Sequence, residues 1–172
     1  MNNDNFEIER KFLIALPIDF AKADIASKSK IEQIYLKDTT ERKNTRIRKR
    51  VFKDVTEYTT TSKIRISNMK RIENEKNISQ IEYESLKQQA DKDLLPIQKI
   101  RYVINYKNQF FEIDVYDFWK NAAVMEIEME NENTKITFPP FIKIIAELTD
   151  DKSFTNHSMA KQIPDITKYF TE

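Results

Sequence analysis

The chain has 172 residues and contains neither glycine nor cysteine. Glycine-rich phosphate loops and dinucleotide-binding fingerprints are therefore excluded, as are disulfides, thiolate metal sites and cysteine nucleophiles. With 29 basic and 28 acidic residues, the formal net charge is only +1, which argues against nucleic acid as a partner. The single histidine, His157, excludes a multi-histidine metal centre, so carboxylates would have to supply any metal ligands.

The length predicts one domain that spans residues 1–172. No apolar run reaches the length that a membrane-spanning helix needs, and residues 1–10 lack the apolar segment of a signal peptide. We therefore expect a cytoplasmic protein with no membrane partner.

Alternation of apolar and polar residues with a period of two predicts eight short strands. They are expected at residues 6–13, 31–36, 45–52, 57–66, 79–84, 98–106, 110–116 and 124–130. Helices are predicted at residues 17–25, 85–95, 141–145, 158–163 and 165–170. Many strands and few helices indicate a mainly β (α+β) fold, built on an antiparallel sheet or barrel with the helices packed outside.

Charged residues of mainly one sign recur at every second position of these strands, and such positions share one face of a sheet. They are Glu7, Glu9 and Lys11; Arg46, Arg48 and Arg50; Lys63 and Arg65; Lys99 and Arg101; Glu112 and Asp114; and Glu126 and Glu128. A merely solvated face usually mixes the two signs. If the sheet closes, the cations can bind a polyphosphate inside it, and the carboxylates can bind the divalent metals that neutralise the polyphosphate.

Several short motifs occur along the chain in a recognisable order. They are Glu7-Ile8-Glu9-Arg10-Lys11 (ExExK), Arg46-Ile47-Arg48 (RxR), Tyr58 to Lys63 (compare YxLTxK), Lys99-Ile100-Arg101-Tyr102 (KxRY), Phe111 to Tyr116, Glu126-Ile127-Glu128, and Glu147 to Asp151 with Asn156. This series resembles the CYTH superfamily, the triphosphate tunnel metalloenzymes, and it extends from Glu7 to Asn156.

The resemblance implies an eight-stranded antiparallel β-barrel that forms a hydrophilic tunnel. It also implies hydrolysis of a triphosphate with Mg²⁺ or Mn²⁺, the metal being bound by Glu7, Glu9, Glu126 and Glu128. The phosphate-binding residues implied are Lys11, Arg46, Arg48, Lys63, Lys99 and Arg101, and Arg50 and Arg65 are further candidates on the same rows. Glu112 and Asp114 would orient water or support a second metal, and together with Lys63 they form the expected catalytic set.

Inorganic tripolyphosphate is the leading substrate, because a short single-domain chain has no added segment for recognising a base. Nucleoside triphosphate, thiamine triphosphate and a class IV-type adenylate cyclase activity stay open. The family often carries R-x-E-x-E on its fifth strand, and residues 78–82, as the matching stretch, would lack the arginine and the first glutamate. That departure favours an alternative, a non-catalytic polyphosphate or nucleotide binder. Family analogy also suggests a homodimer.

Overall fold

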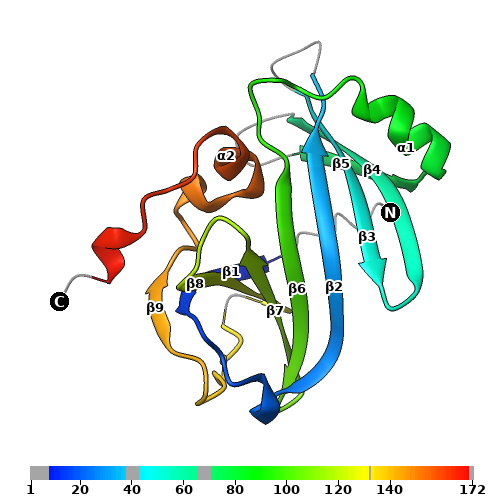
Figure 1. Ribbon diagram of the computed structural model, residues 1–172. Helices are drawn as coiled ribbons and strands as arrows, with labels where there is room; N and C mark the ends of the chain where they lie inside the picture. The colour runs from blue at the N-terminus through cyan, green and yellow to red at the C-terminus, as the bar shows by residue number, and fades with distance from the viewer. Residues whose placement is uncertain (1–7, 38–42, 66–70, 132, 171–172) are drawn as a thin grey trace. The chain divides into compact units, whose positions relative to one another are not determined.

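The computed structural model describes residues 8–37, 43–65, 71–131 and 133–170, with the backbone alone for residues 43, 63–65 and 71–73 (Figure 1). Its strands form one antiparallel nine-stranded sheet in the order β5-β4-β3-β2-β6-β7-β8-β1-β9. The bounds are β1 (Ile8–Ala15), β2 (Asp24–Tyr35), β3 (Lys43–Phe52), β4 (Val55–Arg65), β5 (Arg71–Asn77), β6 (Ile97–Tyr106), β7 (Gln109–Tyr116), β8 (Ala122–Met129) and β9 (Ile144–Glu147). The predicted mainly β, antiparallel fold is confirmed. In the described residues the sheet begins at β5 and ends at β9, so it is open where an eight-stranded barrel was expected.

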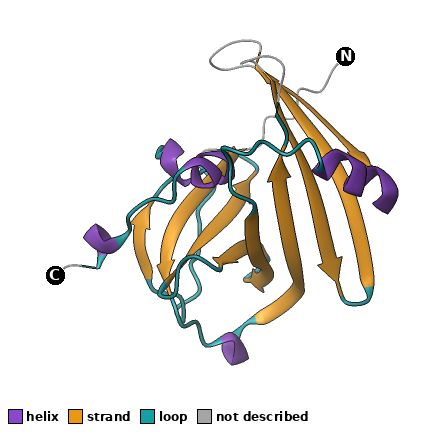
Figure 2. Cartoon of the chain, turned by 45° about the horizontal axis from the view of Figure 1, so that its top comes forward, coloured by secondary structure: helices purple, strands orange, loops and turns teal. Residues whose placement is uncertain are grey.

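Helices are few and short (Figure 2). They are α1 (Gln80–Lys87), α2 (Asn156–Lys161) and the 3-10 turns η1 (Phe20–Lys22), η2 (Lys152–Phe154) and η3 (Thr167–Tyr169). The helix predicted at residues 17–25 is wrong, because its residues Ala21 and Lys22 bury nothing and β2 begins at Asp24. The helix predicted at 141–145 is also wrong, since Ile144 pairs with Ile14 of β1 as part of β9. Among the described residues, no helix is both long and apolar enough to cross a membrane.

The strand predicted at residues 79–84 is wrong, because these residues lie in and next to α1. The Ser79 hydroxyl accepts a hydrogen bond from the Glu82 backbone N–H and so caps the helix. Tyr83 and Leu86, three residues apart, then reach the apolar cluster beneath the helix. The strand before α1 is β5, which lies earlier in the chain than predicted.

The described chain divides into two compact units, which we treat separately. Unit 1 comprises residues 1–28, 100–154 and 164–172, and unit 2 comprises residues 29–99 and 155–163. The prediction of a single domain stays a prediction.

Unit 1 is built on the alternation read from the sequence. Along β7, Phe111 and Ile113 are fully buried, whereas Phe110 and Glu112 on the other face are exposed or partly exposed. Buried positions of β1, β6, β7 and β8, together with Ile18 and Ile142 of the connecting segments, form one apolar core. Its strand members are Phe12, Ile14, Ile104, Phe111, Ile113, Ala123, Met125 and Ile127. The opposite face of the same strands is therefore left for the charged residues.

Unit 2 has a smaller apolar core, on which α1 packs beside β3 and β4 (Figure 1). Ile34, Leu36, Ile47 and Tyr83 are its buried members. Because Ile47 lies between Arg46 and Arg48, the core occupies one face of β3 and the arginines occupy the other.

Glu32 of β2 anchors α1 to the sheet. Its carboxylate accepts hydrogen bonds from the Tyr83 hydroxyl at 2.7 Å, from Lys87 Nζ at 3.1 Å and from Gln98 Nε2 at 2.6 Å. Burial opposes ionisation of Glu32, but these three donors outweigh it, so the pKa of Glu32 is lowered. The anchor is therefore strongest when Glu32 is ionised.

We predict that Phe111→Ala lowers the free energy of unfolding by about 3–5 kcal/mol, because it removes a fully buried ring from the core of unit 1. Phe110→Ala is the matched control, and it should cost no more than about 1 kcal/mol because its side chain is 57% exposed. Denaturant unfolding monitors both variants. Equal losses would contradict the assigned faces of β7.

We also predict that Glu32→Gln lowers the free energy of unfolding by about 2 kcal/mol at neutral pH. The substitution removes the negative charge that accepts hydrogen bonds from Tyr83, Lys87 and Gln98. The pKa of Glu32 lies lower in the folded chain than its ordinary value of 4.5. Its contribution is therefore complete above that value and is lost as the pH falls through the lowered pKa. Acid unfolding of the wild type should converge with that of Glu32→Gln at low pH, and a constant difference would contradict this account.

Candidate functional site

The pairing of β1, β7 and β8 brings the predicted carboxylates of unit 1 onto one face. In the β1–β8 register, Glu9 lies opposite Glu128 and Lys11 lies opposite Glu126. In the β7–β8 register, Glu112 lies opposite Glu126. Neighbours directly across an antiparallel pair have side chains that can interact. Together with Asp114 and Arg101, these residues form what we call the acidic cluster.

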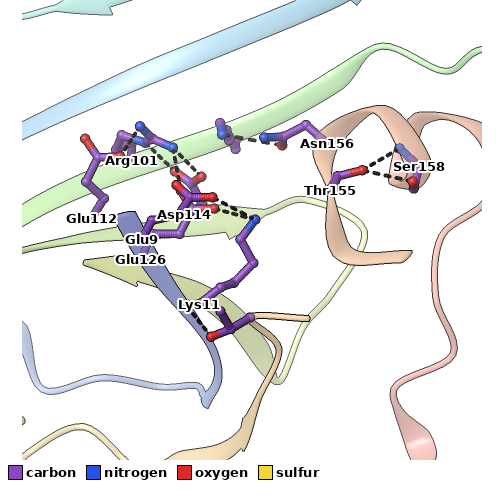
Figure 3. A network of polar contacts seen from close by, with 11 residues as sticks. Glu9, Lys11, Arg101, Glu112, Asp114, Glu126, Thr155, Asn156 and Ser158 are labelled. Atoms are coloured by element: carbon purple, nitrogen blue, oxygen red, sulfur yellow. Dashed lines mark hydrogen bonds and ion pairs between the residues drawn. The ribbon is translucent and has the colours of Figure 1, made fainter. Parts of the chain in front are cut away.

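Arg101 of β6 is the centre of the acidic cluster (Figure 3). Its Nε and Nη2 atoms donate to the two carboxylate oxygens of Asp114, each at 2.7 Å, which is the bidentate arrangement that an arginine fork favours. Its Nη1 atom pairs with Glu112, and its Nη2 atom lies 3.5 Å from Glu126 Oε2. Asp114 is 1% exposed, so Arg101 is the counter-charge that lets this carboxylate stay buried.

Burial opposes the charged form of Arg101, but Asp114 first, and then Glu112 and Glu126, outweigh it and raise the pKa of Arg101 above its ordinary value. Arg101 is therefore a permanent cation within the acidic cluster.

Lys11 is the second cation of the acidic cluster. Its Nζ atom lies 2.8 Å from Glu126 Oε1 and 3.9 Å from Glu9 Oε1, and its side chain is 12% exposed. Glu126 is therefore held between Lys11 and Arg101 (Figure 3).

Negative charge exceeds positive charge within the acidic cluster. Its seven residues are five carboxylates, Glu9, Glu112, Asp114, Glu126 and Glu128, and two cations, Lys11 and Arg101, so they carry a formal surplus of three negative charges. Glu9 and Glu128 are directly opposed, and like charges in that position destabilise a sheet. An added cation would relieve this repulsion.

The donor set of the acidic cluster consists of carboxylate oxygens, which are the ligands that Mg²⁺ and Mn²⁺ prefer. Within the described residues, no three carboxylates are arranged to hold a metal ion as they stand, and the oxygens of Asp114 and Glu126 face Arg101 and Lys11 instead. Glu7, a predicted ligand, lies outside the described residues. The donors fit the expected metals, but binding would require some ion pairs to rearrange.

Unit 2 carries a second polar face, on β2, β3 and β4, which we call the arginine face. In the β2–β3 register, Arg46 lies opposite Tyr35 and Arg48 lies opposite Gln33, and Arg50 follows on the same side. Gln33 Nε2 donates to the Tyr35 hydroxyl at 2.7 Å, and both side chains are buried. Burial raises the pKa of Tyr35 to about 12, although Arg46 and Gln33 act against it, so the hydroxyl stays neutral at physiological pH.

Lys63 and Arg65 lie in β4, Lys63 opposite Asn44 of β3 and Arg65 opposite Arg71 of β5. Only their backbone is described, so their predicted roles stay predictions. Lys99 is 5% exposed, and its Nζ atom lies 3.5 Å from Asn156 Oδ1 of α2.

The arginine face contains buried polar atoms that make no hydrogen bond within the described residues. They are the Nε atom of Arg50, Oγ of Ser29 and Oγ1 of Thr59. Buried donors and acceptors are normally satisfied, so unsatisfied ones call for an explanation such as an unobserved ligand.

The prediction that the fifth strand lacks an arginine and a glutamate is wrong. The observed β5 begins Arg71-Ile72-Glu73-Asn74-Glu75, which has the form R-x-E-x-E. The strand lies at Arg71–Asn77, before the stretch 78–82 that was expected to match it, and the motif itself is the signal in the sequence that locates β5. Glu75 accepts a hydrogen bond from Thr61 Oγ1 at 2.8 Å and pairs with Arg48 Nη2 at 3.2 Å, so it joins the arginine face.

Sequence reasoning also left Glu147 and Thr149 without a role. Arg10 of β1 binds Glu147 through two hydrogen bonds of 2.8 and 2.6 Å. The Thr149 hydroxyl donates to Glu147 at 2.8 Å and accepts from the Lys11 backbone N–H at 3.2 Å. Hydrogen bonds from Arg10 and Thr149 lower the pKa of Glu147, so it stays ionised. This network fixes the backbone of β1 at Lys11.

We predict that Asp114→Asn lowers the free energy of unfolding by about 2 kcal/mol, because Arg101 loses a bidentate charged acceptor that is buried. Glu112→Gln is the matched control, since the side chain of Glu112 is 39% exposed and its pair with Arg101 is screened by water. Thermal or denaturant unfolding compares the two variants. A larger loss in Glu112→Gln would contradict the central place of the Arg101–Asp114 pair.

Comparison with known proteins bears on the family and the fold of the chain. The CYTH domain profile matches residues 5–159. The crystal structure of the inorganic triphosphatase NE1496 is 27% identical, with a TM-score of 0.66, covering 95% of this chain and 100% of that one. A second structure of NE1496, described as a hypothetical protein, is 28% identical, with a TM-score of 0.64, covering 92% of this chain and 100% of that one.

The PH1819 protein of Pyrococcus horikoshii OT3 is 21% identical, with a TM-score of 0.53, covering 74% of this chain and 80% of that one, and it shows the fold alone. None of the curated proteins matches. Because the CYTH profile covers most of the 172 residues, the chain belongs to the CYTH family.

Proposed function

We propose that the protein hydrolyses a triphosphate in a reaction that depends on a divalent metal. The observation that carries this proposal is the strand register of unit 1, which opposes Glu9 to Glu128 and Lys11 to Glu126. It gathers hard-metal ligands and phosphate-binding cations on one face, and both are needed by a substrate with several clustered negative charges.

Glu9, Glu126 and Glu128 would hold Mg²⁺ or Mn²⁺, together with Glu7. When bound, the metal supplies charge neutralisation at the phosphate oxygens. Glu126 would then exchange its contacts with Lys11 and Arg101 for the metal, which would free Lys11 to reach phosphate oxygens while Arg101 stays paired with Asp114. The surplus of negative charge in the acidic cluster supports this exchange. Lys11 and Arg101 do not neutralise all of its carboxylates, so an additional cation would be attracted to them.

The cations of the arginine face would bind the phosphate oxygens. Arg46, Arg48 and Arg50 offer planar forks for bidentate contacts, whereas Lys63 and Lys99 offer compact point charges. The Arg50 side chain is 37% exposed, so its guanidinium is open to an incoming phosphate. Since Glu75 already pairs with Arg48, an incoming phosphate would compete with that carboxylate.

Catalysis would rest on positioning and electrostatics, so no nucleophilic side chain is required. Of the two predicted water-orienting residues, Glu112 is 39% exposed at its side chain and Asp114 is 1% exposed. Glu112 is therefore the better placed to orient an attacking water, while Asp114 holds Arg101.

Inorganic tripolyphosphate is the substrate that we test first. The similarity to the inorganic triphosphatase NE1496 supports it. Trp119 does not offer a stacking surface for a base, because it is 6% exposed and packs against Tyr116, Phe118 and Phe154.

We predict that the protein with Mg²⁺ or Mn²⁺ releases phosphate from tripolyphosphate, and that Glu9→Ala and Arg48→Ala each lower kcat/KM by about 100-fold or more, because each removes a group that stabilises developing charge. The measurement is a phosphate-release assay with tripolyphosphate, ATP, thiamine triphosphate and pyrophosphate, each with and without metal.

The controls are Lys49→Ala, a cation on the opposite face of the same strand as Arg48, and Glu130→Ala, an exposed carboxylate just beyond β8. Both should keep nearly full activity. Normal turnover in Glu9→Ala and Arg48→Ala would contradict the site assignment. Cyclic AMP is also measured in the assay with ATP, since its formation would identify the activity as a cyclase and not a hydrolase. Tight binding of tripolyphosphate without turnover would favour the non-catalytic binder. The expected lack of an arginine and a glutamate on the fifth strand no longer supports that alternative, because β5 contains both.

A further inference from the structure

The segment that follows β9 holds the main chain of Lys11. The Leu148 backbone N–H donates to the Lys11 carbonyl oxygen at 2.8 Å, and the Lys11 backbone N–H donates to the Thr149 hydroxyl oxygen at 3.2 Å. Both backbone groups of Lys11 are therefore bonded on the β9 side of β1. In an antiparallel ladder this makes Lys11 and Glu126 of β8 a non-hydrogen-bonded pair, the kind in which opposed side chains lie closest. The 2.8 Å contact between Lys11 Nζ and Glu126 Oε1 agrees with that geometry (Figure 3).

The Thr149 hydroxyl is itself held in place. It donates to Glu147 Oε1 at 2.8 Å, and with its proton directed there its oxygen accepts from the Lys11 N–H. Arg10 fixes Glu147 in turn, through hydrogen bonds of 2.8 and 2.6 Å from its Nε and Nη2 atoms. Leu148 is 1% exposed and anchors the backbone between Glu147 and Thr149. The hydroxyl therefore presents a fixed acceptor to β1.

The proposed exchange of ion pairs gives this support a consequence for the reaction. When a metal takes Glu126, the ammonium of Lys11 would have to turn from that carboxylate to a phosphate oxygen. The lysine stem is flexible, so the point that its ammonium reaches depends on how firmly the main chain is held. A displacement of about 1 Å in a positioned group can cost up to about 100-fold in rate.

We propose that Thr149 is a positioning residue for the hydrolysis. Its hydroxyl holds the main chain of Lys11, so that the side chain alone moves between Glu126 and the phosphate. Thr149 lies outside the acidic cluster and acts through Lys11. This inference rests on the proposed triphosphate hydrolysis, and it adds a residue to those on which the rate depends.

The test compares phosphate release from tripolyphosphate with Mn²⁺ in the wild type, Thr149→Val and Thr149→Ser. Thr149→Val replaces the hydroxyl with a methyl group of similar size and should lower kcat/KM by about ten-fold. Thr149→Ser keeps the hydroxyl and should retain most of the wild-type value. Because Thr149 is exposed, both variants should keep Tm within about 3 °C of the wild type.

Thr167→Val is the matched control. The Thr167 hydroxyl also donates to a carboxylate two residues earlier, at 2.7 Å from Asp165 Oδ1, but Thr167 belongs to η3 and not to the segment that follows β9. Its replacement should change kcat/KM by less than about two-fold.

A spectroscopic measurement separates positioning from a general loss of structure. Nuclear magnetic resonance of protein labelled with ¹⁵N-lysine observes the ammonium of Lys11, and the signal is identified by its absence in Lys11→Arg. Thr149→Val should shift this signal and should speed exchange of the Lys11 amide hydrogen with water by about ten-fold or more, because the amide loses its acceptor. Thr149→Ser and Thr167→Val should leave both unchanged.

The role of Thr149 would be overturned by any of three results. They are unchanged kcat/KM in Thr149→Val, an equal loss in Thr167→Val or Thr149→Ser, and a loss in Thr149→Val without a change in the Lys11 signals. Each of these results leaves the proposed hydrolysis standing, since the wild type turns over. No phosphate release by the wild type would instead overturn the hydrolysis itself, and the role of Thr149 with it.

Discussion

The buried ion pair between Arg101 and Asp114 is the interaction on which the charged face of unit 1 depends. A carboxylate that is 1% exposed is costly to bury unless a cation with good geometry accompanies it. Arg101 supplies that geometry through two hydrogen bonds of 2.7 Å, and it also reaches Glu112 and Glu126. The remaining carboxylates can then gather around it with a surplus of negative charge.

The same constraint links the fold to the proposed chemistry. One face of β7 and of β8 is committed to the apolar core, so the charges at every second residue of these strands lie on the other face. The hydrogen bonds among Arg10, Glu147 and Thr149 hold the backbone of β1 at Lys11. They therefore help to keep Lys11 opposite Glu126 in the strand register. The proposed metal would replace the contacts of Glu126 with Lys11 and Arg101, and the phosphate would replace the contact of Glu75 with Arg48.

Alternation of period two was enough to predict the β fold and the residues that share each face, because side-chain direction in a strand is a local property. It placed Glu9, Lys11, Glu126 and Glu112 correctly on one face. It failed at residues 79–84, where the same alternating pattern forms α1 because Ser79 caps the helix and Tyr83 finds the core of unit 2. It also could not reveal Glu32 as the anchor of α1, since the three donors to Glu32 come from distant parts of the sequence.

If a metal replaces the ion pairs of Glu126, the protein must bind Mn²⁺ in the absence of substrate. Electron paramagnetic resonance can count free Mn²⁺ during a titration of the wild type and of Glu126→Gln, with Glu130→Gln as the matched control. We expect saturable binding to the wild type and to the control, and much weaker binding to Glu126→Gln. Equal binding by all three proteins, or none by the wild type, would contradict it.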